Sequence, residues 1–144
     1  MLLQCLQRFF RENSQRITGG NRPDITLRED DSAAMRQILR ILHFTGPGNE
    51  IDVKMLAVVA IHCDKYSCNA SLKPWIKNWL ASIGPLESAD DRGLLLLAAY
   101  FFRIPESFAS VSVKIQQDLT PDVLLTWEDH EPLNLLPHGV ISVY

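Results

Sequence analysis

Cysteine is scarce in this chain of 144 residues, which contains Cys5, Cys63 and Cys68. Three thiols cannot all pair within one chain, so a complete set of disulfides is excluded. A reduced intracellular compartment, cytoplasmic and/or nuclear, is the simpler inference. An excess of positive charge is also missing, because 14 Lys and Arg face 17 Asp and Glu, for a net charge of −3. This balance gives no electrostatic reason to expect DNA, RNA or an anionic membrane as a partner.

Long hydrophobic runs are missing as well. The apolar stretch at residues 94–102 is far too short to span a bilayer, so it predicts a buried helix. The chain shows no internal repeat and no low-complexity tract. What it does contain is 47% hydrophobic and 22% charged residues. The chain has the length of one domain, and this composition is sufficient for a hydrophobic core and argues against disorder.

The chain is organised around residues 51–80, where two apolar helical patterns meet across a short polar break. The spacing in each pattern places the apolar side chains on one helical face. The first pattern comprises Leu56, Val59, Ala60 and Cys63, and the second Leu72, Trp75, Ile76, Trp79 and Leu80. So short a break predicts a compact helix-turn-helix, with the first helix nearly central and both tryptophans closing over it.

Upstream of this unit, Met1 to Asn13 reads as an amphipathic helix, and its arginines leave a mitochondrial presequence open as a rival interpretation. Ile25 to Leu27 is the best strand candidate. Asp31 or Ser32 is then a natural N-cap for a helix that the glycines from Gly46 onward stop. The expected buried stripe of that helix is Met35, Ile38, Leu39 and Leu42, with Arg36 and Arg40 outside.

Downstream, residues 88–91 offer caps for the apolar helix, and another short helix begins near Pro105. The inward-facing residues of this second helix are expected to be Phe108, Val111 and Ile115. Prolines prevent a long helix after Thr120, yet many residues there are apolar. We therefore expect the tail to lie against the body.

Candidate chemistry is sparse. His62, Cys63 and Cys68 lie close in sequence, but their spacing fits no usual zinc motif and a fourth ligand is missing. His62 is also expected on a different helical face from the buried stripe. A nucleophilic Cys5 or Cys63 would need a partnered histidine and a pocket. The acidic turn at residues 128–131 is better read as solvated than as an acid-base site. No catalytic, cofactor or metal site is therefore predicted.

Several segments of the sequence resemble a BTB/POZ domain of the type abundant in filamentous fungi. The segments are residues 29–33 (EDDSA), 38–44 (ILRILHF), 64–68 (DKYSC) and 72–75 (LKPW), followed by Trp79. Residues 94–102 and 108–112 (FASVS) resemble the helical extension of those proteins. The resemblance implies an α+β, predominantly helical fold, with a partial BTB/POZ-like domain over residues 1–82 and a helical extension with a packed apolar tail over residues 83–144.

The same resemblance implies a non-catalytic protein-protein interaction module. Such modules act as adaptors, including on cullin ubiquitin ligases, or as transcription-linked regulators, and many self-associate. The strands that precede this region in the family are missing, which implies a misassigned start or a truncated variant. Without them we expect an open strand edge and an uncovered apolar face as the partner-binding surface. Its residues are Leu3, Leu6, Phe10, Ile25 and Leu27. The alternative is a small cysteine- or metal-dependent enzyme that uses Cys63 and His62.

Overall fold

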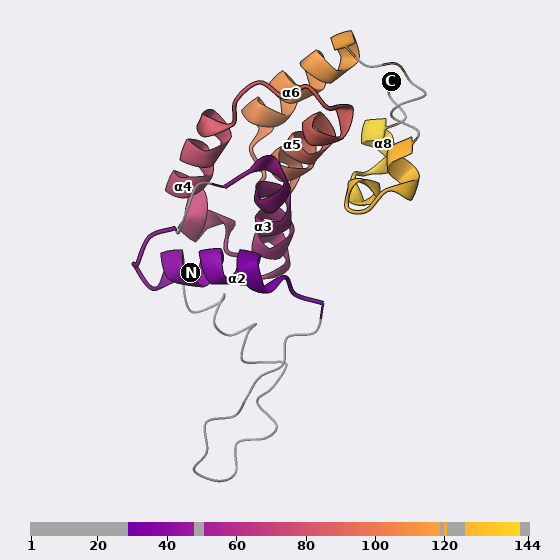
Figure 1. Cartoon of the computed structure of the whole chain (residues 1–144). Coiled ribbons are helices and arrows are strands. Elements are labelled where there is room, and N and C mark those ends of the chain that lie inside the picture. The colour runs from indigo at the N-terminus through magenta and orange to yellow at the C-terminus, as the bar shows by residue number, and fades with distance from the viewer. Residues whose placement is uncertain (1–28, 48–50, 119, 121–125, 142–144) are drawn as a thin grey trace, which may run out of the picture.

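The protein is predominantly helical, as predicted. The structure, a computed structural model, describes residues 29–47, 51–118, 120 and 126–141. Its elements are α2 (Ser32–Leu42), α3 (Val53–Lys65), α4 (Asn69–Ser82), α5 (Ala89–Phe101), α6 (Pro105–Asp118), the 3-10 helices η1 (Trp127–Asp129) and η2 (Leu133–Leu135), and α8 (His138–Ile141) (Figure 1). The described residues form no strand. The expected strand at Ile25 to Leu27 lies outside them, so the α+β assignment stays a prediction.

Helix α3 occupies the centre of the fold, as its apolar pattern predicted. It packs against α2, α4 and, most extensively, α5. Seven of its thirteen residues are buried. The helix begins at an N-cap whose Asp52 Oδ1 accepts a hydrogen bond from the Met55 amide at 2.7 Å. A helix buried on so many sides fixes the positions of the elements packed around it.

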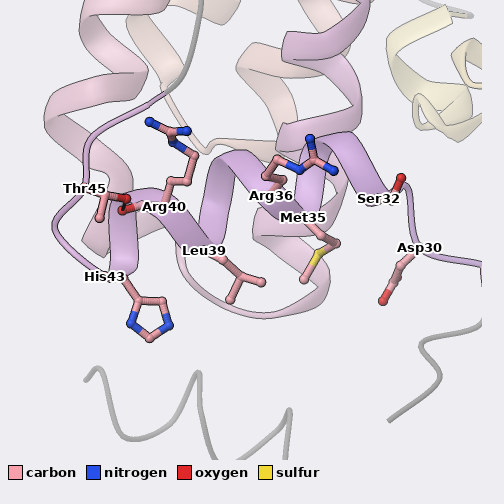
Figure 2. A pocket seen from close by; sticks show the side chains of 8 residues that line it. All are labelled: Asp30, Ser32, Met35, Arg36, Leu39, Arg40, His43 and Thr45. Carbon is pink, nitrogen blue, oxygen red and sulfur yellow. Dashed lines mark hydrogen bonds between the residues drawn. The ribbon is translucent and has the colours of Figure 1, made fainter. Parts of the chain in front are cut away.

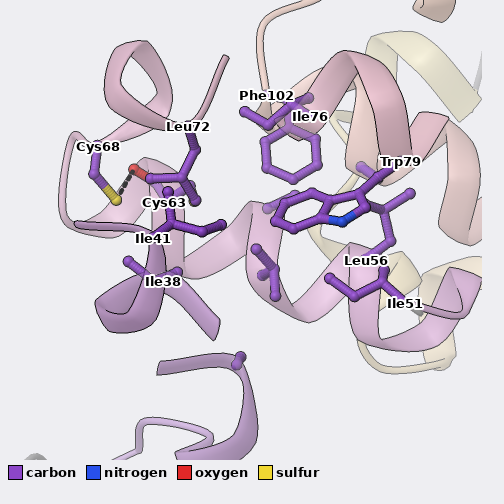
Figure 3. Packing of buried hydrophobic residues seen from close by; sticks show 14 of the residues in the cluster. Ile38, Ile41, Ile51, Leu56, Cys63, Cys68, Leu72, Ile76, Trp79 and Phe102 are labelled. Atoms are coloured by element: carbon purple, nitrogen blue, oxygen red, sulfur yellow. Dashed lines mark hydrogen bonds between the residues drawn. The ribbon is translucent and has the colours of Figure 1, made fainter. Parts of the chain in front are cut away.

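The compact α3–α4 hairpin is confirmed, but only one of its two tryptophans closes the core. Leu72, Ile76 and Trp79 form the buried face of α4. Figure 3 shows Trp79 among the other residues of this apolar cluster, which include Leu56. Trp75, in contrast, is 36% exposed, so its predicted burial is wrong. On a helix, Trp75 lies at the edge of the stripe that Leu72 and Ile76 define, and there its indole reaches solvent.

Helices α2, α3 and α5 end in the same way, although none has a glycine at the turn. Phe44, Ser67 and Arg103 each adopt a left-handed conformation, with φ of 59°, 55° and 59°. In each case this residue and the next donate the paired backbone hydrogen bonds of a Schellman cap, for example from Phe44 to Ile41 and from Thr45 to Arg40. Helix α2 therefore ends at Leu42, earlier than the glycines from Gly46 onward predicted.

The buried face of α2 is rotated from the one expected. Asp31 is the N-cap, as predicted, and its Oδ1 accepts from the Ala34 amide at 2.8 Å. The buried residues are Ala34, Met35, Ile38 and Ile41. Leu39 is 36% exposed, so its predicted burial is wrong, whereas Leu42 is half-buried against the main apolar cluster. Because α2 contacts both α3 and α4, its covered face turns toward Ala34 and Ile41.

Helix α5 is buried, as the apolar run predicted, and the C-terminal segment packs on it. Trp127, Leu133 and Leu136 are buried against α5 and against Val53 and Ala57 of α3. Trp127 Nε1 also donates to Asp90 Oδ1 at 3.1 Å. The expected contact between tail and body is therefore confirmed for residues 126–141. Residues 128–131 are exposed, as predicted.

In helix α6, Ile115 is buried, whereas Phe108 and Val111 are half-buried against the same cluster as the C-terminal segment. Among the described residues, no helix combines the length and the apolar character needed to cross a bilayer.

Candidate functional site

The partner-binding residues that the sequence predicts, Leu3, Leu6, Phe10, Ile25 and Leu27, lie outside the described residues. That surface therefore stays a prediction. The described part of the chain offers two other places to examine: the polar cluster around His62, and the outer face of α2, which begins beside it.

His62, expected on a different helical face of α3 from the buried stripe, is itself buried. Its Nδ1 donates to the Val58 carbonyl at 2.8 Å, and its Nε2 accepts from the Asp31 amide at 3.0 Å. Both ring nitrogens are thus occupied by backbone groups of α3 and of the segment that precedes α2. Neighbouring Cys63 is fully buried. Within the described ranges, no three metal-binding side chains gather into one group.

Asp30 is the centre of the polar cluster and does not cap α2. Its carboxylate, only 3% exposed, lies 2.8 Å from Lys65 Nζ and 3.5 Å from His62 Nε2. The Tyr66 hydroxyl donates to its second oxygen. These contacts join the segment before α2 to the end of α3, across more than thirty positions of sequence. The cluster therefore sets where α2 starts.

The ionised form of Asp30 is the stable one in this cluster. Burial raises the pKa of the Asp30 carboxyl, but hydrogen bonds from Lys65 and Tyr66, and the positive charge of Lys65, outweigh it. The net result is a pKa lowered from the usual 3.8. A group with a lowered folded-state pKa stabilises the fold above its unfolded-state pKa and loses that effect as the pH falls through the folded-state value.

Asp30→Asn is accordingly expected to lower the free energy of unfolding at pH 7 by about 1.5–3 kcal/mol, because hydrogen bonds to a charged group are lost. The difference from the wild type should shrink as the pH falls below about 3.8. This difference in the free energy of unfolding is measured by urea denaturation of both proteins between pH 7 and pH 3, at intervals of about one pH unit. A difference that does not change with pH would show that the Asp30 charge contributes nothing.

The outer face of α2 starts at this cluster and runs to the end of the helix. We call the α2 face the surface formed by Arg36, Leu39, Arg40, His43 and Phe44. Arg36, Leu39, Arg40 and His43 border a hollow of about 540 Å³, which Met35 and Asp30 also line, and Phe44 follows His43 at the cap of the helix. Figure 2 shows Leu39 and His43 projecting along one edge of this outer face, and Arg36 and Arg40 along the other edge. The face thus places apolar and cationic groups side by side.

Phe44 is the most exposed large apolar side chain of the described chain, at 89%. It stands at the C′ position of the α2 cap, with the left-handed φ of 59° that disfavours a bulky residue. The Cβ of such a residue costs roughly 1–2 kcal/mol in this conformation. The fold therefore holds a large apolar ring in solvent at a position where glycine would be more stable.

The charge of the α2 face is positive. Helix α2 contains Arg36 and Arg40 and no acidic residue. Arg40 Nε donates to the Gly46 carbonyl at 3.3 Å, which holds the guanidinium at the end of the helix. Arg36 forms no ion pair with any described residue. The carboxylate that lines the hollow, Asp30, is already neutralised by Lys65.

Sequence reasoning missed this face because it assigned Leu39 to the core and extended the helix toward Gly46. One available signal was the spacing of Arg36, Leu39, Arg40 and His43, which places all four within less than half of the circumference of the helix. The exposure of Phe44 depends on the cap geometry, and no residue type in the sequence marks that geometry.

A second hollow, of about 530 Å³, lies between the α4–α5 connection and α6. Its floor is apolar and includes Leu95 and Ile115. Two cationic and two anionic side chains line it. Arg92 Nη1 pairs with Asp118 at 2.9 Å, and the other two are Lys114 and Glu106. These balanced charges favour neither an anionic nor a cationic ligand. The α2 face, which has a net positive charge, is therefore the stronger candidate for a binding site.

Comparisons of the chain with protein-family models, with curated proteins and with solved structures give no match in any of the three.

Proposed function

We propose that this protein is a non-catalytic protein-protein interaction module and that the α2 face contacts its partner. The observation that carries the proposal is Phe44, an 89% exposed ring in a left-handed conformation at the end of α2, the helix that also exposes Leu39. An exposed apolar group kept at a cost in stability is typical of a binding surface. The BTB/POZ resemblance adds the class of role: an adaptor, for example on a cullin scaffold, a transcription-linked regulator, or a self-associating module.

The second candidate function, a cysteine- or metal-dependent enzyme using Cys63 and His62, has less support. Cys63 is fully buried among apolar side chains, and both His62 nitrogens are bonded to backbone groups. A thiol in such surroundings is inert, because the reactive thiolate form is disfavoured there.

Thiol titration of the native protein distinguishes the two functions. For the interaction module we expect Cys63 to react with a disulfide reagent only as fast as the protein unfolds, because the thiol is buried. Peptide mapping identifies which cysteine has been labelled. Rapid modification of Cys63 in the folded protein would favour the enzyme.

Phe44→Gly tests the interaction function without weakening the fold. Glycine adopts φ of 59° freely, so the free energy of unfolding should rise by about 0.5–1 kcal/mol, which is the relief of strain less the entropy that glycine adds to the unfolded chain. Binding should nevertheless weaken by about tenfold or more, as expected when an apolar anchor is lost. Urea denaturation measures the first effect. Binding is measured in two ways. Sedimentation velocity measures self-association. Anisotropy titration measures binding of a labelled amphipathic peptide whose polar residues are all neutral.

Arg103→Gly is the matched control, because Arg103 occupies the same cap position at the end of α5 and has the same φ of 59°. It should leave both association measurements unchanged. If Phe44→Gly alters neither self-association nor peptide binding, or if Arg103→Gly alters them equally, the α2 face is not the binding surface.

A further inference from the structure

The chemistry of the α2 face also specifies a partner, and this step rests on the proposed function. Arg36 and Arg40 are one helical turn apart, and His43 lies on the opposite edge of the same face, with Leu39. The side chains that could oppose them lie at the other end: Asp30 is paired with Lys65, and Asp31 caps Ala34. Glu29 is exposed beside them. Arg40, in the last turn of α2 near Phe44, is therefore the arginine farthest from these carboxylates.

The apolar part of the face has the dimensions of a helix-binding surface. Leu39 and Phe44 are exposed next to the arginines, and Met35 lines the hollow at the opposite end. Helix α2 has 11 residues and is therefore about 16 Å long. A surface of this length accommodates an amphipathic helix of similar length, with its apolar residues on Leu39 and Phe44.

Nucleic acid fits the same face less well. The whole chain carries a net charge of −3, and Glu29 and Asp31 flank the face at its N-terminal end. Two arginines neutralise few phosphates, whereas a nucleic-acid site requires a more extended basic surface. An exposed phenylalanine and leucine beside isolated cations match a peptide that has both apolar and acidic side chains.

We propose that the α2 face binds an acidic amphipathic helix of a partner protein. The apolar side of that helix covers Leu39 and Phe44, and its carboxylates face Arg36 and Arg40. Its acidic residues gather toward the C-terminal end of α2, because Glu29 and Asp31 repel them at the other end. Binding of this kind weakens as salt rises, since exposed charges are screened.

Three labelled peptides of about 14 residues test the proposal on the full chain. They share one leucine stripe at helical spacing and carry glutamate, glutamine or lysine at the flanking positions. By anisotropy, the glutamate peptide should bind at least about tenfold more tightly than the lysine peptide at low salt, with a smaller ratio at high salt. Arg36→Glu/Arg40→Glu should reverse this preference. Lys73→Glu/Lys77→Glu, which makes the same charge change one turn apart on exposed α4 positions, should preserve it.

The outcomes separate this inference from the proposed function. Equal binding of all three peptides, lost on Phe44→Gly, would overturn the acidic partner and leave the interaction function in place. Failure of every peptide to bind, or tighter binding of an oligonucleotide than of the glutamate peptide, would overturn the acidic helix as the occupant. A photo-crosslinker at position 44 adds a further check. Crosslinks from it to residues 1–28 of the same chain, or to a second copy, would also overturn the proposal.

Discussion

Trp127→Ala is expected to lower the free energy of unfolding by about 3–5 kcal/mol, the usual cost of truncating a fully buried aromatic side chain. Trp127 is the largest fully buried side chain of the described residues, at 1% exposure. Its removal leaves an empty volume among residues of α3 and α5, including Ala57 and Leu97. It also removes the hydrogen bond to Asp90. The C-terminal segment would therefore lose its main attachment, which urea denaturation measures.

Leu135→Ala is the matched control for this prediction. Leu135 belongs to the same C-terminal segment but is 48% exposed, so its truncation should cost about 0.5 kcal/mol or less. A similar small loss for Trp127→Ala would mean that the segment contributes little to stability.

Gly93→Ala probes the same contact from the side of α5. An added Cβ would lie 2.8 Å from Trp127 Cζ2 and 3.0 Å from Leu133 Cδ2, so the indole would have to move. If Trp127 is rigidly held, this substitution is destabilising despite the higher helix propensity of alanine. Gly84→Ala, where an added Cβ meets nothing within 4 Å, is the control.

The helices could be predicted from the sequence because the evidence for them is local. The apolar spacing from Leu56 to Cys63 and the uninterrupted run at residues 94–102 both produced buried helices. Asp31 could be assigned as a cap for the same reason, since its partner, Ala34, is three positions away. Burial of the tail followed from its apolar content, because apolar residues gain free energy when they leave water.

The rest depended on contacts between distant residues or on backbone geometry that residue types do not signal. The role of Asp30 could not be predicted, because its partners Lys65 and Tyr66 are more than thirty positions away in the sequence. The burial of His62 could not be predicted, because the sequence does not show that the segment before α2 covers it. The last residues of α2, α3 and α5 could not be predicted from the sequence. Glycine usually occupies the left-handed position after a helix, but here that position is taken by Phe44, Ser67 and Arg103. The α2 face could be recognised only after that cap was known.

Substituting each tryptophan of α4 distinguishes the predicted core from the observed one. Trp79→Ala should cost about 3–5 kcal/mol, because the side chain is only 5% exposed and packs in the cluster that contains Leu56, Ile76 and Phe102. Trp75→Ala should cost about 1 kcal/mol or less, because this indole, at the edge of the buried stripe, already contacts water. Trp79→Phe should recover much of the loss, since it restores an aromatic ring to the same space. Chemical denaturation of the three variants gives the values. Equal losses for Trp75→Ala and Trp79→Ala would mean that α4 presents both indoles to α3, with its axis rotated from the orientation described above.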